Sequence, residues 1–346
     1  MGGGSWSTDA YDARSLAKAA AGKSTFDHSD AIRSGQKAAA VHDLLNPRIL
    51  AGDKSPHAGQ VMRECMVSDE HPNPTPIAVL LDVTGSNYQA AVTVHSKLPN
   101  LQGALQRKGY VDDPQILVGA IGDAFSDTVP LQIGQFESDN RLDEQIEAMY
   151  LEGNGGGQVH ETYEIGAYFM ARHTYLEPLE RDGKKGYLFF IGDEMPYESI
   201  HTGDFGYARH TIESLTGDKL DEPISTEAIF AELKEKYEVF FLFQKQGAYT
   251  EDRILPAWKK LLGERALVLD DPNAVAETIA LTLAVLEGGL TLDDGLDDLK
   301  DAGMDDGAVR AAGKALAVVG SGRAAVATTS GELPGIDNGD SGAERL

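Results

Sequence analysis

The stretch Ile77-Ala-Val-Leu-Leu-Asp82-Val-Thr84-Gly-Ser86-Asn87 predicts a buried strand that ends in oxygen-bearing side chains. Five consecutive apolar residues followed by a turn with glycine are typical of a parallel strand that is buried on both faces. Asp82, Thr84 and Ser86 then lie in the loop at the carboxyl end of this strand, where open α/β sheets bind their ligands. Carboxylate and hydroxyl oxygens are hard donors that suit Mg²⁺, Mn²⁺ or Ca²⁺.

Strands and helices alternate along the chain after this stretch. The alternation predicts an α/β fold with a doubly wound, mostly parallel, Rossmann-like sheet and helices on both faces. Further buried strands are expected over residues 116–121, 187–191, 239–243 and 266–269. Helices are expected over residues 87–107, 139–150, 161–177, 225–237, 254–262 and 274–286.

One more strand is expected at an edge of the sheet. Residues 129–135 alternate apolar and polar side chains and follow the preceding strand after a short connection. A short connection favours an antiparallel pair. Because proline is tolerated at sheet edges, Pro130 fits an antiparallel edge strand.

Composition divides the chain into three parts, of which residues 1–72 are a polar and partly helical N-terminal extension. Helices are expected over residues 15–21 and 31–45. The extension also carries the aromatic residues Trp6, Tyr11 and Phe26. Because these rings are too apolar for a solvated arm, we expect the extension to pack on the main domain.

The α/β domain is expected over residues 73–287, after a proline-rich boundary segment. Residues 288–346 begin with an acidic stretch whose spacing predicts short helices. This stretch lacks the ligand spacing and the closing glutamate of an EF-hand. From about Gly320 the chain is rich in alanine, glycine, serine and threonine, which predicts a disordered tail.

The string Gly22-Lys23-Ser24-Thr25 is similar to the end of a phosphate-binding loop. Ala17 stands where that motif needs its first glycine, and no strand is expected before it. A plain helix end is therefore the favoured interpretation of this string.

The overall charge narrows the classes of partner. The chain has 30 basic and 55 acidic residues, which gives a formal charge of −25. Such a charge disfavours binding to nucleic acid and to anionic membrane surfaces.

Cys65 is the only cysteine, so an internal disulfide is excluded and a reducing compartment is favoured. No apolar run reaches membrane-spanning length and no secretory signal pattern begins the sequence, so we expect a cytoplasmic protein.

Acidic residues follow three of the predicted strands, namely Asp82, Asp123 and Asp193. In a parallel sheet these ends meet at one edge, where carboxylates repel each other unless a cation lies between them. The glycines at residues 155–157 form a loop that can approach the same edge closely. The sequence therefore predicts an oxygen-rich site for a divalent metal. Helix capping by Asp82 is the alternative.

The stretch Asp82-Val-Thr84-Gly-Ser86 resembles the D-x-S-x-S signature of von Willebrand factor A (vWA) domains. Those domains build a metal-ion-dependent adhesion site (MIDAS). The resemblance covers roughly residues 75–287, with strands, hairpin and helices in the family order. Thr84 replaces the first serine of the signature and keeps its hydroxyl.

Two further segments resemble the other metal loops of vWA domains. The glycines at residues 155–157 resemble the second loop, and Ile191-Gly-Asp193 resembles the third. The threonine expected after the glycines is missing, so Gln158 or Glu161 would have to take its place. The glycine usual after the third-loop aspartate is missing as well.

The resemblance implies that Asp82 and Asp193 act mostly through water, while Thr84 and Ser86 bind the metal directly. It also implies one open coordination position, which a carboxylate of the partner fills. The expected metal is Mg²⁺, with Mn²⁺ or Ca²⁺ as alternatives. The predicted metal-site residues are Asp82, Thr84, Ser86, Asp123, Gln158, Glu161 and Asp193.

We therefore expect a metal-dependent protein-binding module with a MIDAS-like site that captures an acidic group of a partner protein. The resemblance implies that the protein works within an intracellular assembly of several proteins. It also implies that an ATPase is one class of partner. No nucleophile is paired with a base, so catalysis is not indicated. Two alternatives stay open, a Mg-dependent phosphohydrolase that uses the same carboxylates and a scaffold with a degenerate metal site. Thr84 stands where a phosphotransferase of the haloacid-dehalogenase type needs its second aspartate, which argues against the hydrolase.

Overall fold

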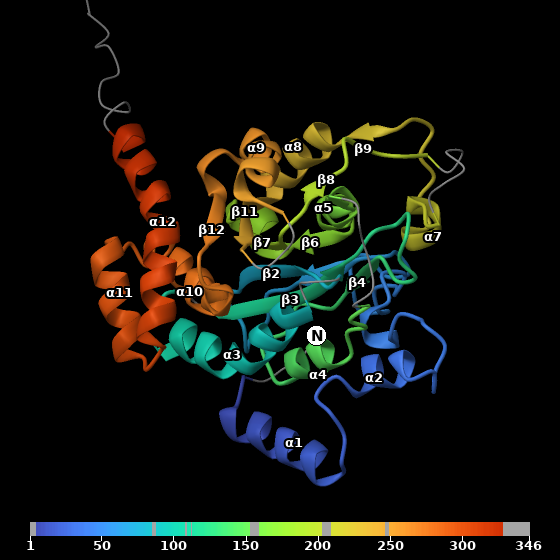
Figure 1. The fold of residues 1–346 in the computed structure, drawn as a ribbon, viewed down its shortest axis with the longest axis horizontal. Coiled ribbons are helices and arrows are strands. Elements are labelled where there is room, and N and C mark those ends of the chain that lie inside the picture. The colour runs from blue at the N-terminus through green and yellow to red at the C-terminus, as the bar shows by residue number, and fades with distance from the viewer. Residues whose placement is uncertain are drawn as a thin grey trace, which may run out of the picture.

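A six-stranded sheet in the order β12-β11-β7-β2-β3-β4 forms the centre of the molecule (Figure 1). The computed structural model describes residues 5–84, 88–107, 109–111, 113–152, 159–202, 209–245 and 249–327. The strands are β2 (Thr75–Asp82), β3 (Pro114–Ile121), β4 (Leu131–Ile133), β7 (Gly186–Gly192), β11 (Tyr237–Gln244) and β12 (Ala266–Leu269). All neighbours are parallel except β3 and β4. The predicted mostly parallel sheet with one antiparallel edge strand is confirmed.

The register of the central strands brings three strand ends together. β2 is fully buried and lies between β3 and β7. Asp82 at the end of β2 pairs with Ile121 of β3, and Leu81 pairs with Ile191 of β7. The residues that follow these three strands therefore start at the same edge of the sheet.

Alternate residues of β2 enter two separate hydrophobic cores, because successive side chains of a strand point to opposite faces. Ile77 and Val79 belong to the first core, and Ala78 and Leu80 to the second. Helices α3 (Tyr88–Arg107), α4 (Arg141–Glu147) and α10 (Val275–Leu286) cover the first core (Figure 1). Helices α5 (Tyr163–Arg172), α8 (Thr226–Lys236) and α9 (Glu251–Leu262) cover the second. The expected helices on both faces are confirmed.

Shorter elements connect the main ones. They are β1 (Arg63–Cys65), β5 (His160–Glu161), β6 (Thr174–Leu176), β8 (Met195–Pro196), β9 (Ser199–Ile200), β10 (Ile224–Ser225), α6 (Glu177–Asp182), α7 (Ile212–Thr216) and the 3₁₀ turns Asp43–Leu45, Gly263–Arg265 and Pro272–Ala274. In the part of the chain that the structure describes, β1 pairs with β6, β5 with β8, and β9 with β10. Across the described ranges, no helix combines the length and the apolar character that a membrane crossing needs.

The helix expected over residues 161–177 is shorter than predicted at both ends. Glu161 lies in β5, and α5 ends at Arg172. The following residues Thr174–Leu176 form β6, which pairs in parallel with β1. This pairing joins segments far apart in the chain, so no local pattern could reveal it.

The helix expected over residues 31–45 is wrong. Helix α2 (Asp27–Arg33) ends early, and Gly35 follows with a φ of +76°. This left-handed conformation, which glycine adopts without strain, ends the helix. Helix α1 (Thr8–Ala20) begins earlier than expected because the Ser7 side chain accepts a hydrogen bond from the Ala10 amide and caps it.

The N-terminal extension packs on the first core, as predicted. Trp6 and Phe26 are 8% and 4% exposed and belong to that core. Tyr11 packs against the same core, and its hydroxyl donates to the His95 carbonyl oxygen of α3 at 3.2 Å. Helix α1 thus lies along the outer side of α3 and α4 (Figure 1).

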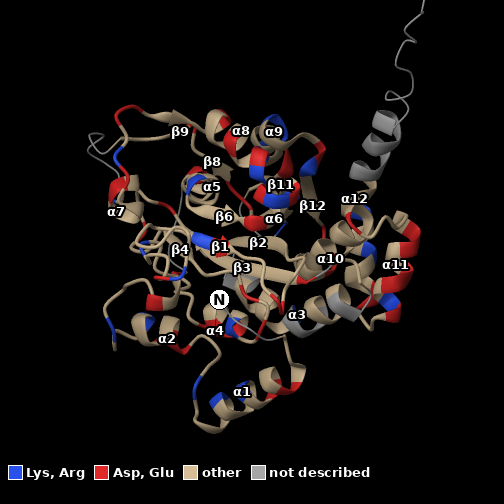
Figure 2. Cartoon of the chain, turned by 180° about the vertical axis from the view of Figure 1, so that it is seen from behind, with Lys and Arg blue, Asp and Glu red and all other residues tan. Residues whose placement is uncertain are grey.

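The acidic C-terminal segment forms α11 (Leu292–Asp301) and α12 (Asp306–Ala327), which pack beside α10 (Figure 1). Leu299, Val309 and Ala312 are fully buried in the first core. Acidic residues mark the outer surface of α11 (Figure 2). Helix α12 continues past Gly320 to Ala327, because this alanine-rich sequence favours a helix. Residues 328–346 lie outside the described residues.

Arg63 is a fully buried cation that joins three segments of the chain. Its guanidinium donates to the carbonyl oxygens of Asn46 at 2.7 Å, Ile49 at 3.1 Å and Gly134 at 2.9 Å. Burial lowers the pKa of Arg63 to about 10. The hydrogen bonds to carbonyl dipoles offset the cost of burying the charge.

Arg63→Ala is expected to lower the free energy of unfolding by at least about 3 kcal/mol, because several buried carbonyl oxygens lose their donor. Urea denaturation followed by circular dichroism measures the change. Arg172→Ala is the matched control, since Arg172 pairs with Glu232 in a bridge whose side chains are 37% and 44% exposed. The control should lose less than about 1 kcal/mol. Equal losses in the two variants would contradict the role of Arg63.

A cluster of charges fastens α1 to α4. Arg14 and Lys18 approach the buried Glu147 carboxylate at 2.9 and 2.8 Å. His95 Nε2 lies 3.6 Å from the same carboxylate, within ion-pair distance but beyond that of a hydrogen bond. Burial alone would raise the pKa of Glu147, but interaction with His95, Arg14 and Lys18 outweighs burial and lowers this pKa to about 2.

Glu147→Gln is expected to lower the free energy of unfolding by about 3 kcal/mol at neutral pH, because a lowered carboxylate pKa stabilises the folded state. The contribution is complete above the ordinary pKa of 4.5 and is lost as the pH falls towards 2. The difference between wild type and variant in urea denaturation should therefore shrink across this window. Glu144→Gln on the same helix is the control and should change stability less, since that side chain is 42% exposed. A difference that does not depend on pH would rule out this account.

Candidate metal centre

A cluster of buried carboxyl groups lies where β2 and β7 end. Asp82 is the last residue of β2, and Asp193 and Glu194 directly follow β7. The parallel pair of β5 with β8 places Glu161 opposite Pro196 and so brings it to the same edge. Asp82, Glu161 and Asp193 are each at most 2% exposed, and Glu194 is 8% exposed.

The Thr84 hydroxyl contacts two of these carboxylates at once. It lies 2.8 Å from Asp82 Oδ1 and 2.9 Å from Glu161 Oε1. The Thr84 backbone amide also donates to Asp82 Oδ1 at 2.9 Å, and the Tyr163 hydroxyl donates to Asp82 Oδ2 at 3.1 Å. A hydroxyl has only one proton to donate, so one of its two carboxylate contacts needs a second proton or a cation.

The carboxyl groups raise each other's pKa values. Burial is the largest cause for Asp82, followed by the charge of Asp193, and together they raise the pKa of Asp82 to about 7. Burial and the charge of Asp82 raise the pKa of Glu194 to about 8. Burial and the same charge raise the pKa of Glu161 well above its ordinary value. Negative charge at this edge is therefore poorly compensated by the protein itself.

The donors present fit a hard divalent cation. Glu161 Oε2 and Glu194 Oε2 are buried oxygen atoms that no N–H or hydroxyl donor reaches among the described residues, and these two side chains interact with each other. Carboxylate and hydroxyl oxygens are the ligands that Mg²⁺, Mn²⁺ and Ca²⁺ prefer. Within the described ranges, no three His, Cys, Asp or Glu side chains are arranged to hold a metal by themselves. A cation here would therefore also depend on hydroxyl groups such as that of Thr84, or on water.

Asp123 lies in the loop that follows β3, where it makes a separate set of hydrogen bonds. Its carboxylate accepts hydrogen bonds from the Ser126 hydroxyl at 2.9 Å and from the Tyr197 hydroxyl at 3.1 Å. Its backbone amide donates to Asp127 Oδ2 at 2.7 Å. Asp123 still contributes to the raised pKa of Glu194, so its charge acts on the cluster. The structure thus brings Asp82, Thr84 and Glu161 into direct contact and holds Asp123 through other partners.

The remaining predicted residues are Ser86, Gln158 and the glycines at 155–157, and they lie outside the described residues. Two residues of the cluster were missed by the sequence analysis. Glu194 directly follows Asp193, so its position next to a predicted ligand was a signal. Tyr163 gave no such signal, because its contact with Asp82 depends on the packing of α5.

Gly192 makes the contact between Tyr163 and Asp82 possible. A Cβ atom at Gly192 would clash with the Tyr163 hydroxyl and would lie 3.0 Å from Asp82 Cβ. The end of β7 therefore needs a residue without a side chain, so that the tyrosine can reach the carboxylate.

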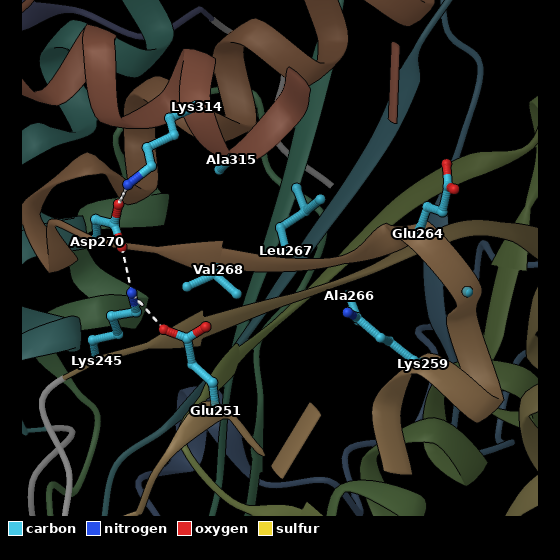
Figure 3. Close-up of a pocket in the computed structure, with 11 residues that line it drawn as sticks. Lys245, Glu251, Lys259, Glu264, Ala266, Leu267, Val268, Asp270, Lys314 and Ala315 are labelled. Atoms are coloured by element: carbon cyan, nitrogen blue, oxygen red, sulfur yellow. Dashed lines mark hydrogen bonds and ion pairs between the residues drawn. The ribbon is translucent and has the colours of Figure 1, made fainter. Parts of the chain in front are cut away.

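A cavity of about 550 Å³ lies beside the edge strand β12 and is a second place where a ligand could bind (Figure 3). Its charged side chains neutralise one another. Lys245 pairs with Glu251 and Asp270, and Lys314 pairs with Asp270 as well (Figure 3). The pKa values of Asp82, Glu161 and Glu194 are all raised, so the carboxyl cluster is the stronger candidate for a cation-binding site.

Glu194→Gln is expected to raise the free energy of unfolding of the metal-free protein by about 1–3 kcal/mol at neutral pH, because the raised pKa of Glu194 makes the folded protein take up a proton that the unfolded chain does not need, and glutamine has no such cost. Urea denaturation in the presence of a chelator measures the effect. Glu198→Gln is the matched control, since Glu198 is exposed, and it should change stability by less than about 0.5 kcal/mol. Destabilisation by Glu194→Gln would show that the carboxyl groups do not repel each other in this way.

No protein-family model matches the sequence, and no curated protein matches it. Among solved structures, the chain is similar to the pilus adhesin SpaC from Lactobacillus rhamnosus GG in its open conformation. The identity is 14% and the TM-score 0.42, over 70% of this chain and 31% of that chain. It is also similar to proximal thread matrix protein 1 (PTMP1) from the mussel byssus, in a structure with a zinc-occupied MIDAS motif. There the identity is 13% and the TM-score 0.35, over 64% of this chain and 48% of that chain.

A third similar structure is the vWF domain of the type V pili tip protein Mfa5 from Porphyromonas gingivalis. The identity is 13% and the TM-score 0.40, over 62% of this chain and 96% of that chain. The chain spans about a third of the length of SpaC and about half of that of PTMP1. The mostly parallel sheet and its antiparallel edge strand are those expected from the sequence. The chain has a doubly wound α/β fold with a mostly parallel sheet, and a vWF domain is among the solved structures to which it is similar.

Proposed function

We propose that this chain is a metal-dependent protein-binding module whose MIDAS-like site captures an acidic group of a partner protein through a divalent cation. The observation that carries the proposal is the buried contact of the Thr84 hydroxyl with both Asp82 and Glu161. One hydroxyl proton cannot serve two carboxylates, and a cation relieves this conflict. Mg²⁺ is the proposed ion, with Mn²⁺ and Ca²⁺ as alternatives.

The residues proposed to hold the cation are Asp82, Thr84, Ser86 and Glu161, with Asp193 beside them. Glu161 supplies an oxygen in place of the threonine that the vWA resemblance leads us to expect. Two hydrogen bonds orient Asp82 for this role, one from the Tyr163 hydroxyl and one from the Thr84 amide. When bound, the cation would offer an open coordination position to the carboxylate of the partner.

The partner is proposed to be a protein within an intracellular assembly, and an ATPase is one partner class that the vWA resemblance implies. The single cysteine, Cys65, supports a reducing compartment. The similar structures named above are a pilus adhesin, a pilus tip protein and a byssus protein. Mass spectrometry of the cross-linked protein in its native cell would identify the compartment and the partner.

Titration calorimetry with Mg²⁺, Mn²⁺ and Ca²⁺ tests the metal site. The wild type should bind one of these ions, and Asp82→Ala and Thr84→Val should each weaken binding at least about tenfold, because each removes oxygen ligands or their support. Asp221→Ala is the matched control, since it removes an exposed aspartate in a loop, and its affinity should equal that of the wild type.

Two outcomes would contradict the proposal. A wild-type protein that binds none of the three ions would be a scaffold with a degenerate site. Metal-dependent turnover of p-nitrophenyl phosphate that is lost in Asp82→Ala would instead assign the carboxylates to a phosphohydrolase.

A further inference from the structure

Three side chains near the amino ends of β2 and β3 form a chain of hydrogen bonds. The Ser138 hydroxyl oxygen lies 2.9 Å from His71 Nε2, and His71 Nδ1 lies 2.6 Å from Asp113 Oδ1. They thus stand in the order of a nucleophile, a base and the group that orients the base. The sequence analysis expected no nucleophile paired with a base, because these residues come from separate segments that only the fold brings together.

The groups around His71 determine which of its nitrogen atoms carries the proton. A carboxylate only accepts hydrogen bonds, so the proton of the neutral imidazole ring lies on Nδ1, facing Asp113. Nε2 then presents its lone pair to the Ser138 hydroxyl, which donates to it. This is the tautomer that a general base needs in order to take the proton of an attacking serine.

Backbone contacts hold the serine and the histidine in place. The Glu137 amide donates to the Ile116 carbonyl oxygen at 3.0 Å, and the Ile116 amide donates to the Glu137 carbonyl oxygen at 2.8 Å. This pair fixes the segment that carries Ser138 beside β3. His71 closes a turn in which the Ser68 amide donates to the His71 carbonyl oxygen at 2.9 Å. Both side chains therefore project from positions that the backbone defines.

Asp113 is held in a left-handed backbone conformation with a φ of +51°. For a residue with a side chain this conformation costs on the order of 1 kcal/mol, and such strain persists where the surrounding structure enforces it. The Thr75 amide at the start of β2 donates to the Asp113 carbonyl oxygen at 3.0 Å. The carboxylate that faces His71 is therefore positioned by the edge of the central sheet itself.

Ser138, His71 and Asp113 lie at the opposite end of the sheet from the carboxyl cluster, and we call them the serine triad. Asp113 directly precedes β3, and His71 comes shortly before β2. β2 has eight residues, and a strand rises about 3.3 Å per residue, so the two ends of the strand are about 25 Å apart. The serine triad is therefore separate from the proposed metal site.

The serine triad is largely buried. Ser138 and His71 are 5% and 7% exposed, and Asp113 is partly exposed. Burial strengthens the contact between the imidazole and the carboxylate, because the local dielectric constant is lower than that of water. It also restricts what can reach the serine hydroxyl to a small group.

The charges beside Ser138 favour a substrate without negative charge. Glu137 and Asp139 flank it in the sequence, and Arg141 pairs with both, at 2.7 and 3.1 Å. Two carboxylates that share one cation leave a net negative charge, which repels anions. A small, uncharged ester therefore suits this place best.

We propose that Ser138 is a nucleophile that accepts a small acyl group, such as acetyl, from an uncharged ester. Ser138 Oγ bonds to the acyl carbon while its proton passes to His71 Nε2, which gives it to the departing alcohol oxygen as the ester bond breaks. Water then attacks the acyl-serine and passes a proton through His71 to Ser138 Oγ, which releases the carboxylic acid. Asp113 stays ionised and is a positioning residue, because it holds His71 in the required tautomer.

A fluorophosphonate probe tests the nucleophile, because it reacts with a serine whose proton a base removes. A bond forms between Oγ and phosphorus as fluoride leaves. With a chelator present, the full chain is expected to take up one equivalent of probe at Ser138, as located by peptide mass spectrometry. Ser34 is the control site and should stay unlabelled, since it is exposed and its hydroxyl donates to the Ala31 carbonyl oxygen.

Four variants connect the labelling to the serine triad. Ser138→Ala should take up no probe, and His71→Gln should react at least about 100-fold more slowly. Asp113→Asn should react at least about tenfold more slowly, because an amide does not fix the tautomer. Asparagine tolerates the left-handed conformation, so this variant keeps the backbone. Ser34→Ala is the matched control and should react like the wild type. Thermal melting followed by circular dichroism shows which variants are folded.

The ester p-nitrophenyl acetate tests the acyl transfer. The wild type should release p-nitrophenol and carry an acetyl group on Ser138, which mass spectrometry locates. Folded Ser138→Ala should lose both signals. Reaction of Ser138 with the fluorophosphonate but not with the ester would overturn acetyl transfer as its activity.

Two results would overturn the serine triad as a whole. One is labelling of exposed serines while Ser138 stays unmodified, a result that needs no variant and so holds even if Ser138→Ala does not fold. The other is an equal labelling rate in the wild type and in folded His71→Gln or Asp113→Asn. Neither result bears on the proposed metal site, because the chelator is present throughout and the two sites share no residue.

Discussion

Mutual repulsion among the buried carboxyl groups of Asp82, Glu161, Asp193 and Glu194 is the constraint on which the rest of this structure depends. Four such groups in a space with little water would separate unless a rigid frame held them together. The frame is the central strand β2, which is buried along its whole length and packed between two hydrophobic cores. Packing in the two cores offsets the repulsion among the carboxyl groups at this edge, as is common at functional sites.

Precise positioning at this edge comes from small structural features. The parallel pair of β5 with β8 brings Glu161 to the ends of β2 and β7. Gly192 leaves room for the Tyr163 hydroxyl, which then fixes one oxygen of Asp82. The Thr84 amide fixes the other oxygen. Asp82 is therefore oriented before any ligand arrives, which reduces the cost of ordering the site on binding.

The sequence contained most of the sheet, because runs such as Ile77 to Leu81 are too apolar to lie anywhere but inside. The sequence also showed that Asp82 and Asp193 stand at the ends of predicted strands. Both carboxylates were therefore expected at the same edge of the sheet. Contacts made across the fold could not be predicted. The pairing of β1 with β6 shortens α5, and the packing of Tyr163 against Asp82 depends on helix α5 as a whole. Gly35 could have shown that the helix expected over residues 31–45 is interrupted, because glycine commonly follows the end of a helix.

The contacts of Arg63 tie the residues before β2 to the interior of the α/β domain. Its guanidinium holds carbonyl groups of Asn46 and Ile49 on one side and of Gly134 on the other. A fragment cut at the proline-rich boundary before β2 would lose this cation and leave the carbonyl groups around β4 without their donor. The first core would also lose Trp6 and Phe26. The N-terminal residues are thus part of the folding unit, and the α/β domain excised without them would lack one side of its own interior.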